Sequence, residues 1–145
     1  MRVLLAACAI ATLASPAMAE SFNVTGMQVV THRGSDVTLK TGDNYVDRKN
    51  QLICTSDKGC SLVIQTQINF KDFQQVYRIC TLVDGVEAAP PCQEIIPPYP
   101  GTVATFQGAP GLAKGTHTVQ TDIWAQNSVG FRVGSYQLVY TLYQH

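Results

Sequence analysis

The chain has 145 residues, with ten Lys and Arg, ten Asp and Glu and a formal net charge of zero at pH 7. The charges are scattered singly, which argues against nucleic acid and other phosphate-rich partners, because these require a basic patch. The length suits one domain with one hydrophobic core.

The first nineteen residues have the pattern of a secretory signal peptide. Arg2 precedes an apolar run over residues 3–14, and the small-residue pattern Ala17-Met18-Ala19 follows. We expect cleavage near Ala19, which would leave a single domain over residues 20–145 in the periplasm or outside the cell.

Two alternatives to cleavage are disfavoured. The apolar run is shorter than the roughly 20 residues that a membrane-spanning helix needs, so no membrane span is expected. The stretch Leu5-Ala6-Ala7-Cys8 resembles the lipid-attachment motif of bacterial lipoproteins, but Cys8 lies too early to leave room for an apolar region.

Four cysteines remain after the signal peptide, namely Cys54, Cys60, Cys80 and Cys92. In an oxidising compartment they are expected to pair. Four cysteines allow three connectivities that a sequence cannot distinguish, although the spacing favours two local loops, Cys54 with Cys60 and Cys80 with Cys92. The chain lacks the C-x2-C pairs of tetrahedral zinc sites, so we expect structural disulfides and no metal.

The dominant hydrophobic period is two. Apolar residues and Thr66 alternate with polar ones over residues 62–70, which predicts a half-buried strand. A second strand over residues 76–83 ends at Asp84-Gly85, a dipeptide suited to a tight hairpin turn. A weak return strand over residues 86–89 ends at Pro90-Pro91, which predicts a sheet edge.

The other segments follow the same pattern. We expect opening strands over residues 22–31, 37–40 and 45–46. An irregular loop is expected over 93–99, then a short strand over 102–107 and turn residues over 108–111 and at Gly115. The last two strands are expected over 116–126 and 131–143, with a bulge at Gly134. No stretch has helical spacing, so the fold class is all-β, a β-sandwich of about seven to nine antiparallel strands.

The order of these signals over residues 55–145 resembles immunoglobulin-like and fibronectin-like domains. The long strand near Cys60, the Val83-Asp84-Gly85 hairpin and the closing pair that begins at Gly115 carry the resemblance. The chain departs from the antibody pattern at two points. The strand from Thr116 has no cysteine to form the usual bridge between the sheets, and Trp124 lies on the penultimate strand instead of the strand after the first cysteine. The resemblance therefore implies an immunoglobulin-like architecture, and an architecture of this kind does not specify a function.

Catalytic patterns are missing from the sequence. The three histidines, His32, His117 and His145, have no metal-binding spacing, and no G-x-S-x-G elbow is present. His117 and Asp122 fall on opposite faces of one predicted strand, so we expect His117 to be a hydrogen-bonded core residue. A glycosidase requires a pair of carboxylates, and the sequence does not single out Glu87, Glu94 or any Asp as a member of such a pair. We therefore expect no enzyme activity and no cofactor.

Two further groups of side chains are candidates for sites. The acidic residues of the first half, Asp36, Asp43, Asp47 and Asp57, lack the closing glutamate of a calcium loop and fit a solvated turn better. Among the aromatic residues, alternation places Tyr136 and Tyr140 in the core. Tyr99, Trp124 and Tyr143 are therefore the candidates for an exposed binding surface.

These observations favour a noncatalytic secreted or periplasmic module that binds a protein or a small ligand, or that serves as an accessory of the envelope. Its loops over residues 93–100 and 108–114 are the expected binding elements. One alternative is a small secreted inhibitor of a hydrolase, which would present the braced segment from Cys80 to Cys92. A metal-dependent or carboxylate-dependent hydrolase is the least favoured alternative.

Overall fold

The computed structural model describes residues 25–39, 45–46, 49–72, 76–97, 99–125 and 131–145, which form ten strand segments and no helix. In chain order these are β1 (Gly26–Leu39), β2 (Tyr45–Val46), β3 (Asn50–Cys54), β4 (Cys60–Phe70), β5 (Tyr77–Val83), β6 (Val86–Glu87), β7 (Gln93–Ile95), β8 (Gly101–Leu112), β9 (Gly115–Ala125) and β10 (Phe131–Gln144). The expected all-β class is confirmed.

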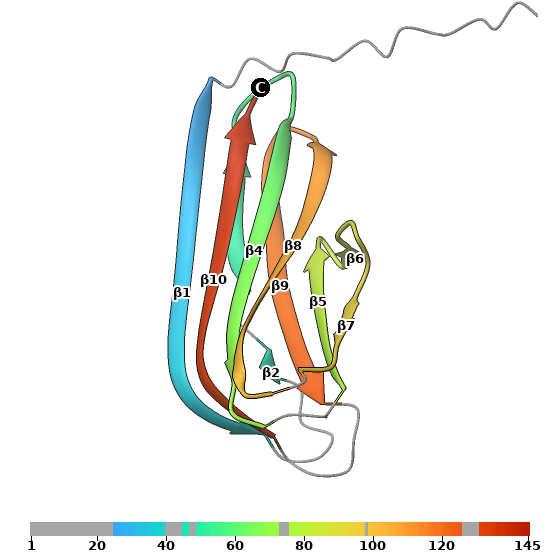
Figure 1. Cartoon of the computed structure of the whole chain (residues 1–145). Helices are drawn as coiled ribbons and strands as arrows, with labels where there is room; N and C mark the ends of the chain where they lie inside the picture. The colour runs from blue at the N-terminus through green and yellow to red at the C-terminus, as the bar shows by residue number, and fades with distance from the viewer. Residues whose placement is uncertain (1–24, 40–44, 47–48, 73–75, 98, 126–130) are drawn as a thin grey trace, which may run out of the picture.

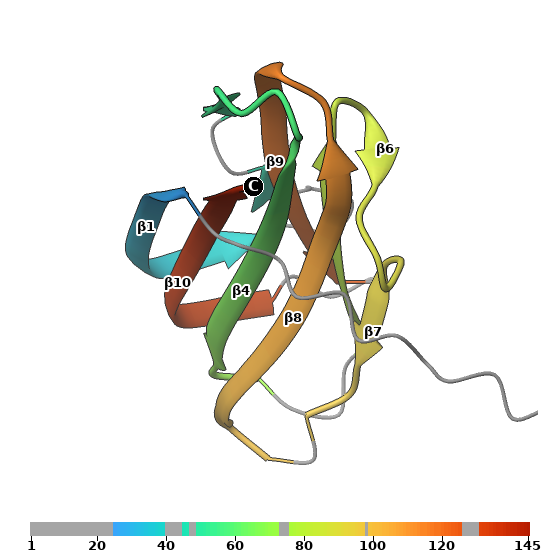
Figure 2. The ribbon, with the colours of Figure 1, turned by 90° about the horizontal axis from the view of Figure 1, so that it is seen from above.

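The strands form two antiparallel sheets that face each other (Figures 1 and 2). Sheet A has four strands in the order β1-β10-β4-β8. Sheet B has six, in which β9 pairs with β2, β3 and β5, and β5 pairs with β6 and β7. Because consecutive strands often lie in different sheets, the chain crosses the sandwich repeatedly. The predicted β-sandwich is therefore confirmed.

The core lies between the two sheets because each long strand turns alternate side chains inward. On β4 the inward residues from Leu62 to Phe70 are all buried, as the period-two pattern predicted. Two apolar clusters result. One contains Leu62, Ile64, Val83, Val119 and Leu138 among others, and the second contains Ile68, Phe70, Tyr77, Ile79, Ile123 and Val133.

A layer of buried threonines separates the two clusters. Thr66 lies between the clusters on β4, and Thr81 and Thr121 occupy the same level on β5 and β9. The Thr81 and Thr121 hydroxyl oxygens are 3.0 Å apart, and the Tyr140 hydroxyl donates to Thr121 Oγ1 at 2.9 Å. These hydrogen bonds offset the burial of the hydroxyl groups.

Several local predictions are confirmed. The Asp84-Gly85 turn has positive φ angles of 52° and 83° and pairs Val83 with Val86. The disulfides join Cys54 to Cys60 and Cys80 to Cys92, with Cα–Cα distances of 5.9 and 4.2 Å. The register between β10 and β4 shifts between Val133 and Ser135, on either side of the bulge predicted at Gly134. Both β1 and β10 bend in this lower part of the sheet (Figure 1).

Other boundaries differ from the predictions. β1 is one continuous strand where two were expected, because it pairs with β10 from Gly26 to Leu39. β8 runs to Leu112, through the segment expected to turn, because it pairs with β4 as far as Cys60. Gly108 also forms a bridge with Ala89. The expected loop over residues 93–99 begins with strand β7, and β3 was not predicted at all.

Two disulfides are typical of proteins in oxidising compartments. Among the residues that the structure describes, there is no helix capable of crossing a membrane. The expected signal peptide lies outside those residues, so its cleavage near Ala19 stays a prediction.

Candidate binding site

The outer face of sheet A carries two adjacent rows of polar side chains. The pairing registers place Arg33, Gln137, Gln67 and Ala104 in one row across β1, β10, β4 and β8. Ser35, Ser135, Asn69 and Thr102 form the next row. Neighbouring strands lie about 5 Å apart and the rows about 7 Å apart, so polar groups from four strands gather on a small area.

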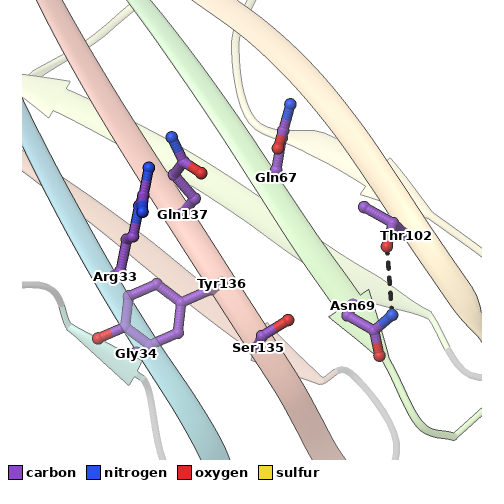
Figure 3. A pocket seen from close by; sticks show the side chains of 8 residues that line it. All are labelled: Arg33, Gly34, Gln67, Asn69, Thr102, Ser135, Tyr136 and Gln137. Carbon is purple, nitrogen blue, oxygen red and sulfur yellow. Dashed lines mark hydrogen bonds between the residues drawn. The ribbon is translucent and has the colours of Figure 1, made fainter.

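A cavity of about 460 Å³ opens between these rows (Figure 3). It is lined by Arg33, Gly34, Gln67, Asn69, Thr102, Ser135, Tyr136 and Gln137. At its floor, Gly34 on β1 pairs with Tyr136 on β10. A Cβ atom at Gly34 would overlap the ring of Tyr136, which packs against both core clusters. The cavity thus lies directly over the edge of the core.

Most polar side chains of the cavity have open hydrogen-bonding groups. Asn69 Nδ2 donates to Thr102 Oγ1 at 3.2 Å, which is the pair drawn in Figure 3. Within the described part of the chain, no hydrogen bond or ion pair involves the side chain of Arg33, Gln67, Ser135 or Gln137. Together these side chains offer a guanidinium, a hydroxyl and two amides, so that both donors and acceptors face the cavity.

The upper part of the same face carries exposed apolar side chains among polar ones. Met27, Val29, Val63 and Phe106 are exposed there. Phe106 is 58% exposed on β8, two residues along the strand from Ala104 of the Arg33 row. The outer face of sheet A therefore combines an exposed aromatic ring with a polar cavity.

A second cavity of about 500 Å³ lies beside the β5–β6 turn and is lined by Lys49, Leu82, Asp84, Gly85, Thr118 and Gln120. Its polar groups are largely used within the protein. Asp84 interacts with His117 and with the Thr118 amide, and Gln120 Nε2 donates to Asp122 at 2.9 Å. This arrangement holds β9 against the turn and leaves fewer open groups than the cavity of sheet A.

The three aromatic residues predicted as a binding surface lie apart. Tyr99 is 72% exposed in the connection between β7 and β8. Trp124 lies on β9 of sheet B, with the Arg78 guanidinium 5.3 Å from its ring centroid. Tyr143 pairs with Met27 on sheet A. They do not form one continuous surface, and binding through any one of them stays a prediction.

Sequence reasoning missed the polar cavity. The alternation on β4 placed Gln67 and Asn69 on one outward face, which was a usable signal. Arg33 and Gln137 join that face only through the registers of β1 and β10. The segment over residues 108–114 was expected to be a loop that binds a partner. It is strand as far as Leu112, so the loop expectation was wrong for residues 108–112, and binding by this segment stays a prediction.

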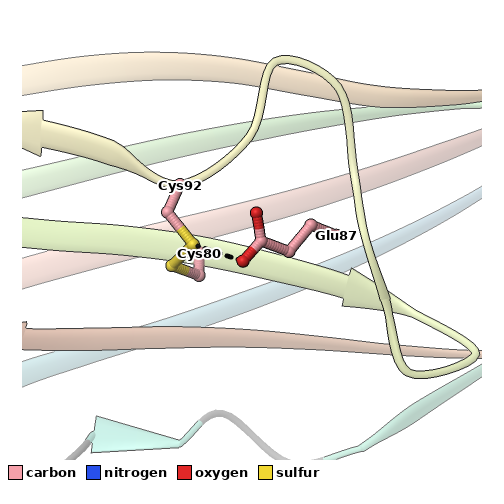
Figure 4. Close-up of side chains that lie close together, drawn as sticks. All are labelled: Cys80, Glu87 and Cys92. Atoms are coloured by element: carbon pink, nitrogen blue, oxygen red, sulfur yellow. Dashed lines mark hydrogen bonds between the residues drawn. A yellow bond between two sulfur atoms is a disulfide. The ribbon is translucent and has the colours of Figure 1, made fainter.

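Glu87 lies beside the Cys80–Cys92 disulfide (Figure 4). Its Oε1 atom is 3.2 Å from Cys92 Sγ, and the three potential ligand atoms lie within 4.8 Å of one another. Because both sulfurs are oxidised, neither offers a thiolate to a metal. In this oxidised form the cluster presents a single carboxylate.

The expected solvated turn falls partly outside the structure. Asp43 and Asp47 lie outside the described residues, so the turn there stays a prediction. Asp57 pairs with Lys114 at 2.7 Å, and both side chains are exposed.

Comparison with known proteins shows similarity to solved structures only. No family model and no curated protein matches the chain. The chain is similar to FLHE at 14% identity, with 83% of this chain and 99% of that chain covered and a TM-score of 0.40. For a family 35 carbohydrate-binding module from Clostridium thermocellum the identity is 11%, the coverage 72% and 98%, and the TM-score 0.40.

PorU from Porphyromonas gingivalis has a TM-score of 0.51 at 6% identity, and the similarity covers 88% of this chain. The chain spans only 14% of the PorU chain. This similarity concerns the fold alone and agrees with an all-β domain.

Proposed function

We propose that this protein is a noncatalytic binding module that holds a carbohydrate in the polar cavity of sheet A. The observation that supports this proposal most directly is that the side chains of Gln67, Ser135 and Gln137 line the cavity and make no hydrogen bond within the described part of the chain. A sugar hydroxyl both donates and accepts hydrogen bonds, and an amide side chain offers both partners. Phe106, exposed nearby on β8, would provide an apolar surface for the C–H face of a sugar ring.

The chemistry of the lining supports binding without turnover. None of the eight residues that line the cavity is a carboxylate, a thiol or an imidazole. Glycoside hydrolysis generally requires a pair of carboxyl groups on either side of the scissile bond. A ligand in this cavity would therefore meet hydrogen-bonding groups and no acid–base pair.

The test is a glycan-binding screen followed by calorimetry. The purified protein is applied to a panel of immobilised glycans, and the Kd is measured for each glycan retained. Gln67→Ala and Gln137→Ala should each raise the Kd about fivefold to tenfold, because each removes hydrogen bonds worth about 1 kcal/mol. The matched control is Gln51→Ala, which removes an exposed glutamine from β3 of sheet B.

The control should bind as the unchanged protein does. Retention of no glycan would contradict the proposal. So would cavity variants whose affinities equal that of the control.

A further inference from the structure

We infer that the cavity of sheet A selects an acidic carbohydrate, whose anionic group binds to Arg33. This inference rests on the proposed function and names the ligand class of the same site. It starts from charge, because Arg33 is the only charged residue among the eight that line the cavity.

Arg33 is exposed on β1, and its guanidinium has no ion-pair or hydrogen-bond partner among the described residues. The group has five N–H donors in a planar fork and no acceptor. A carboxylate matches this fork with two parallel hydrogen bonds, and a sulfate ester offers oxygens of the same kind. The open fork therefore favours an anion over a neutral hydroxyl.

The other arginine of sheet A, Arg132, pairs with Thr38 five residues along β1 from Arg33, and its charge is already neutralised. Arg132 at the start of β10 donates from Nη2 to Asp72 Oδ1 at 3.0 Å, and its backbone N–H donates to Asp72 Oδ2 at 2.6 Å. Burial raises the pKa of Asp72, but these bonds from Arg132 outweigh it and lower that pKa overall. Asp72 therefore stays ionised and paired with Arg132. Among the described residues that line the cavity, Arg33 provides the unpaired positive charge.

The register gives the anion polar neighbours. Arg33, Gln137 and Gln67 lie side by side across β1, β10 and β4, and Figure 3 shows Arg33 next to Gln137. The strands are about 5 Å apart, so a ligand held at Arg33 is within reach of both amides. The amides would bind the hydroxyl groups of the same sugar, which makes the site specific for a polyol that carries an anion.

The test compares matched ligands. Calorimetry measures the Kd for an oligouronate, for the same oligomer reduced at its carboxyl groups to a neutral sugar, and for a sulfated oligosaccharide. The protein should bind at least one of the two acidic ligands about tenfold or more tightly than the neutral one. The acidic ligand with the lower Kd identifies the preferred anion as carboxylate or sulfate. Raising the salt concentration should raise the Kd of the acidic ligand more than that of the neutral one, because salt screens the interaction between opposite charges.

Three variants locate the effect. Arg33→Gln should reduce the ratio of acidic to neutral affinity to about one, and Arg33→Lys should give an intermediate ratio, because it keeps the charge but loses the fork. Lys58→Gln removes one positive charge from the exposed β3–β4 loop and should keep the full ratio. Circular dichroism and thermal melting check that each variant is folded.

The possible failures are distinguishable. Equal affinity of the unchanged protein for acidic and neutral ligands would overturn this inference and leave the proposed function in place. A preference that survives in Arg33→Gln would overturn the role of Arg33. Absence of binding to all three ligands and to the glycan panel would overturn both proposals.

Discussion

The imidazole of His117 joins the Asp84 turn to the beginning of β9. Its Nδ1 lies 2.7 Å from Asp84 Oδ2, and its Nε2 lies 2.7 Å from the carbonyl oxygen of Ala113. Both partners are acceptors, so both contacts are hydrogen bonds only when both ring nitrogens carry protons, and the geometry favours the imidazolium form. Asp84 Oδ1 also accepts the Thr118 N–H at 2.7 Å.

This pair predicts a stability that depends on pH. Burial alone would lower the pKa of His117, but its bonds to Asp84 and Ala113 raise it overall. The hydrogen bond from His117, followed by the one from Thr118, lowers the pKa of Asp84. The stabilisation from His117 is therefore complete below its unfolded pKa, near 6.5, and is lost as the pH rises through the raised pKa. The contribution of Asp84 is lost as the pH falls from about 3.8 through its lowered pKa.

We expect His117→Gln to lower the free energy of unfolding by about 1 kcal/mol between pH 4.5 and 6, a modest value because Asp84 is partly exposed. The difference from the unchanged protein should shrink at pH 8 and above. Urea denaturation at several pH values measures it. A difference that stays constant from pH 5 to pH 9 would contradict a charged His117.

Gln144 ties the end of β10 to the β3–β4 loop. Its Oε1 accepts the Thr55 and Ser56 N–H groups at 2.8 and 3.2 Å, and its Nε2 donates to the Ile53 carbonyl at 3.0 Å. Gln144→Leu leaves these backbone groups unpaired and should destabilise the protein by about 1–2 kcal/mol in urea denaturation.

The matched control is Gln28→Leu. It removes a single exposed hydrogen bond, in which Gln28 Oε1 accepts from the Ile53 N–H at 3.1 Å, and it should change stability by less than about 0.5 kcal/mol. Equal effects of the two substitutions would show that the hydrogen bonds of the Gln144 side chain stabilise the protein no more than the single bond of Gln28.

The buried threonines should respond in opposite directions to the same substitution. Thr66 Oγ1 is buried and has no hydrogen-bond partner among the described residues, so Thr66→Val should stabilise the protein by up to about 1 kcal/mol. Thr121→Val removes the partner of both Thr81 and Tyr140 and should destabilise it by about 1–2 kcal/mol. Thermal and urea unfolding measure both. Changes of the same sign would contradict this account of the threonine layer.

Gly34 makes room for Tyr136 at the edge of the core. Gly34→Ala would force the Tyr136 ring away, and we expect a destabilisation of about 1–2 kcal/mol from the strained packing. In a Tyr136→Ala background the same substitution should be neutral or slightly stabilising, because alanine restricts the unfolded chain more than glycine does. A double-mutant cycle by urea denaturation gives the coupling. Additive effects would disprove the contact as the cause.

The local features of this fold were predictable because they depend on neighbours in the chain. The alternation over residues 62–70 follows from the opposite directions of successive side chains in a strand. The Asp84-Gly85 turn follows from backbone angles that favour this dipeptide. The disulfides join cysteines separated by only 6 and 12 positions, so short loops brought them together.

The sequence by itself therefore determined the all-β class, the inward face of β4 and the hairpin. Only the tertiary structure decided that Arg33, Gln137 and Gln67 share a row. It also decided that His117 contacts Asp84, which is 33 positions away in the chain. The physical reason is register, because a shift of one residue between paired strands turns every side chain to the other face. Register depends on the packing of the whole sandwich, and that information is absent from any single strand.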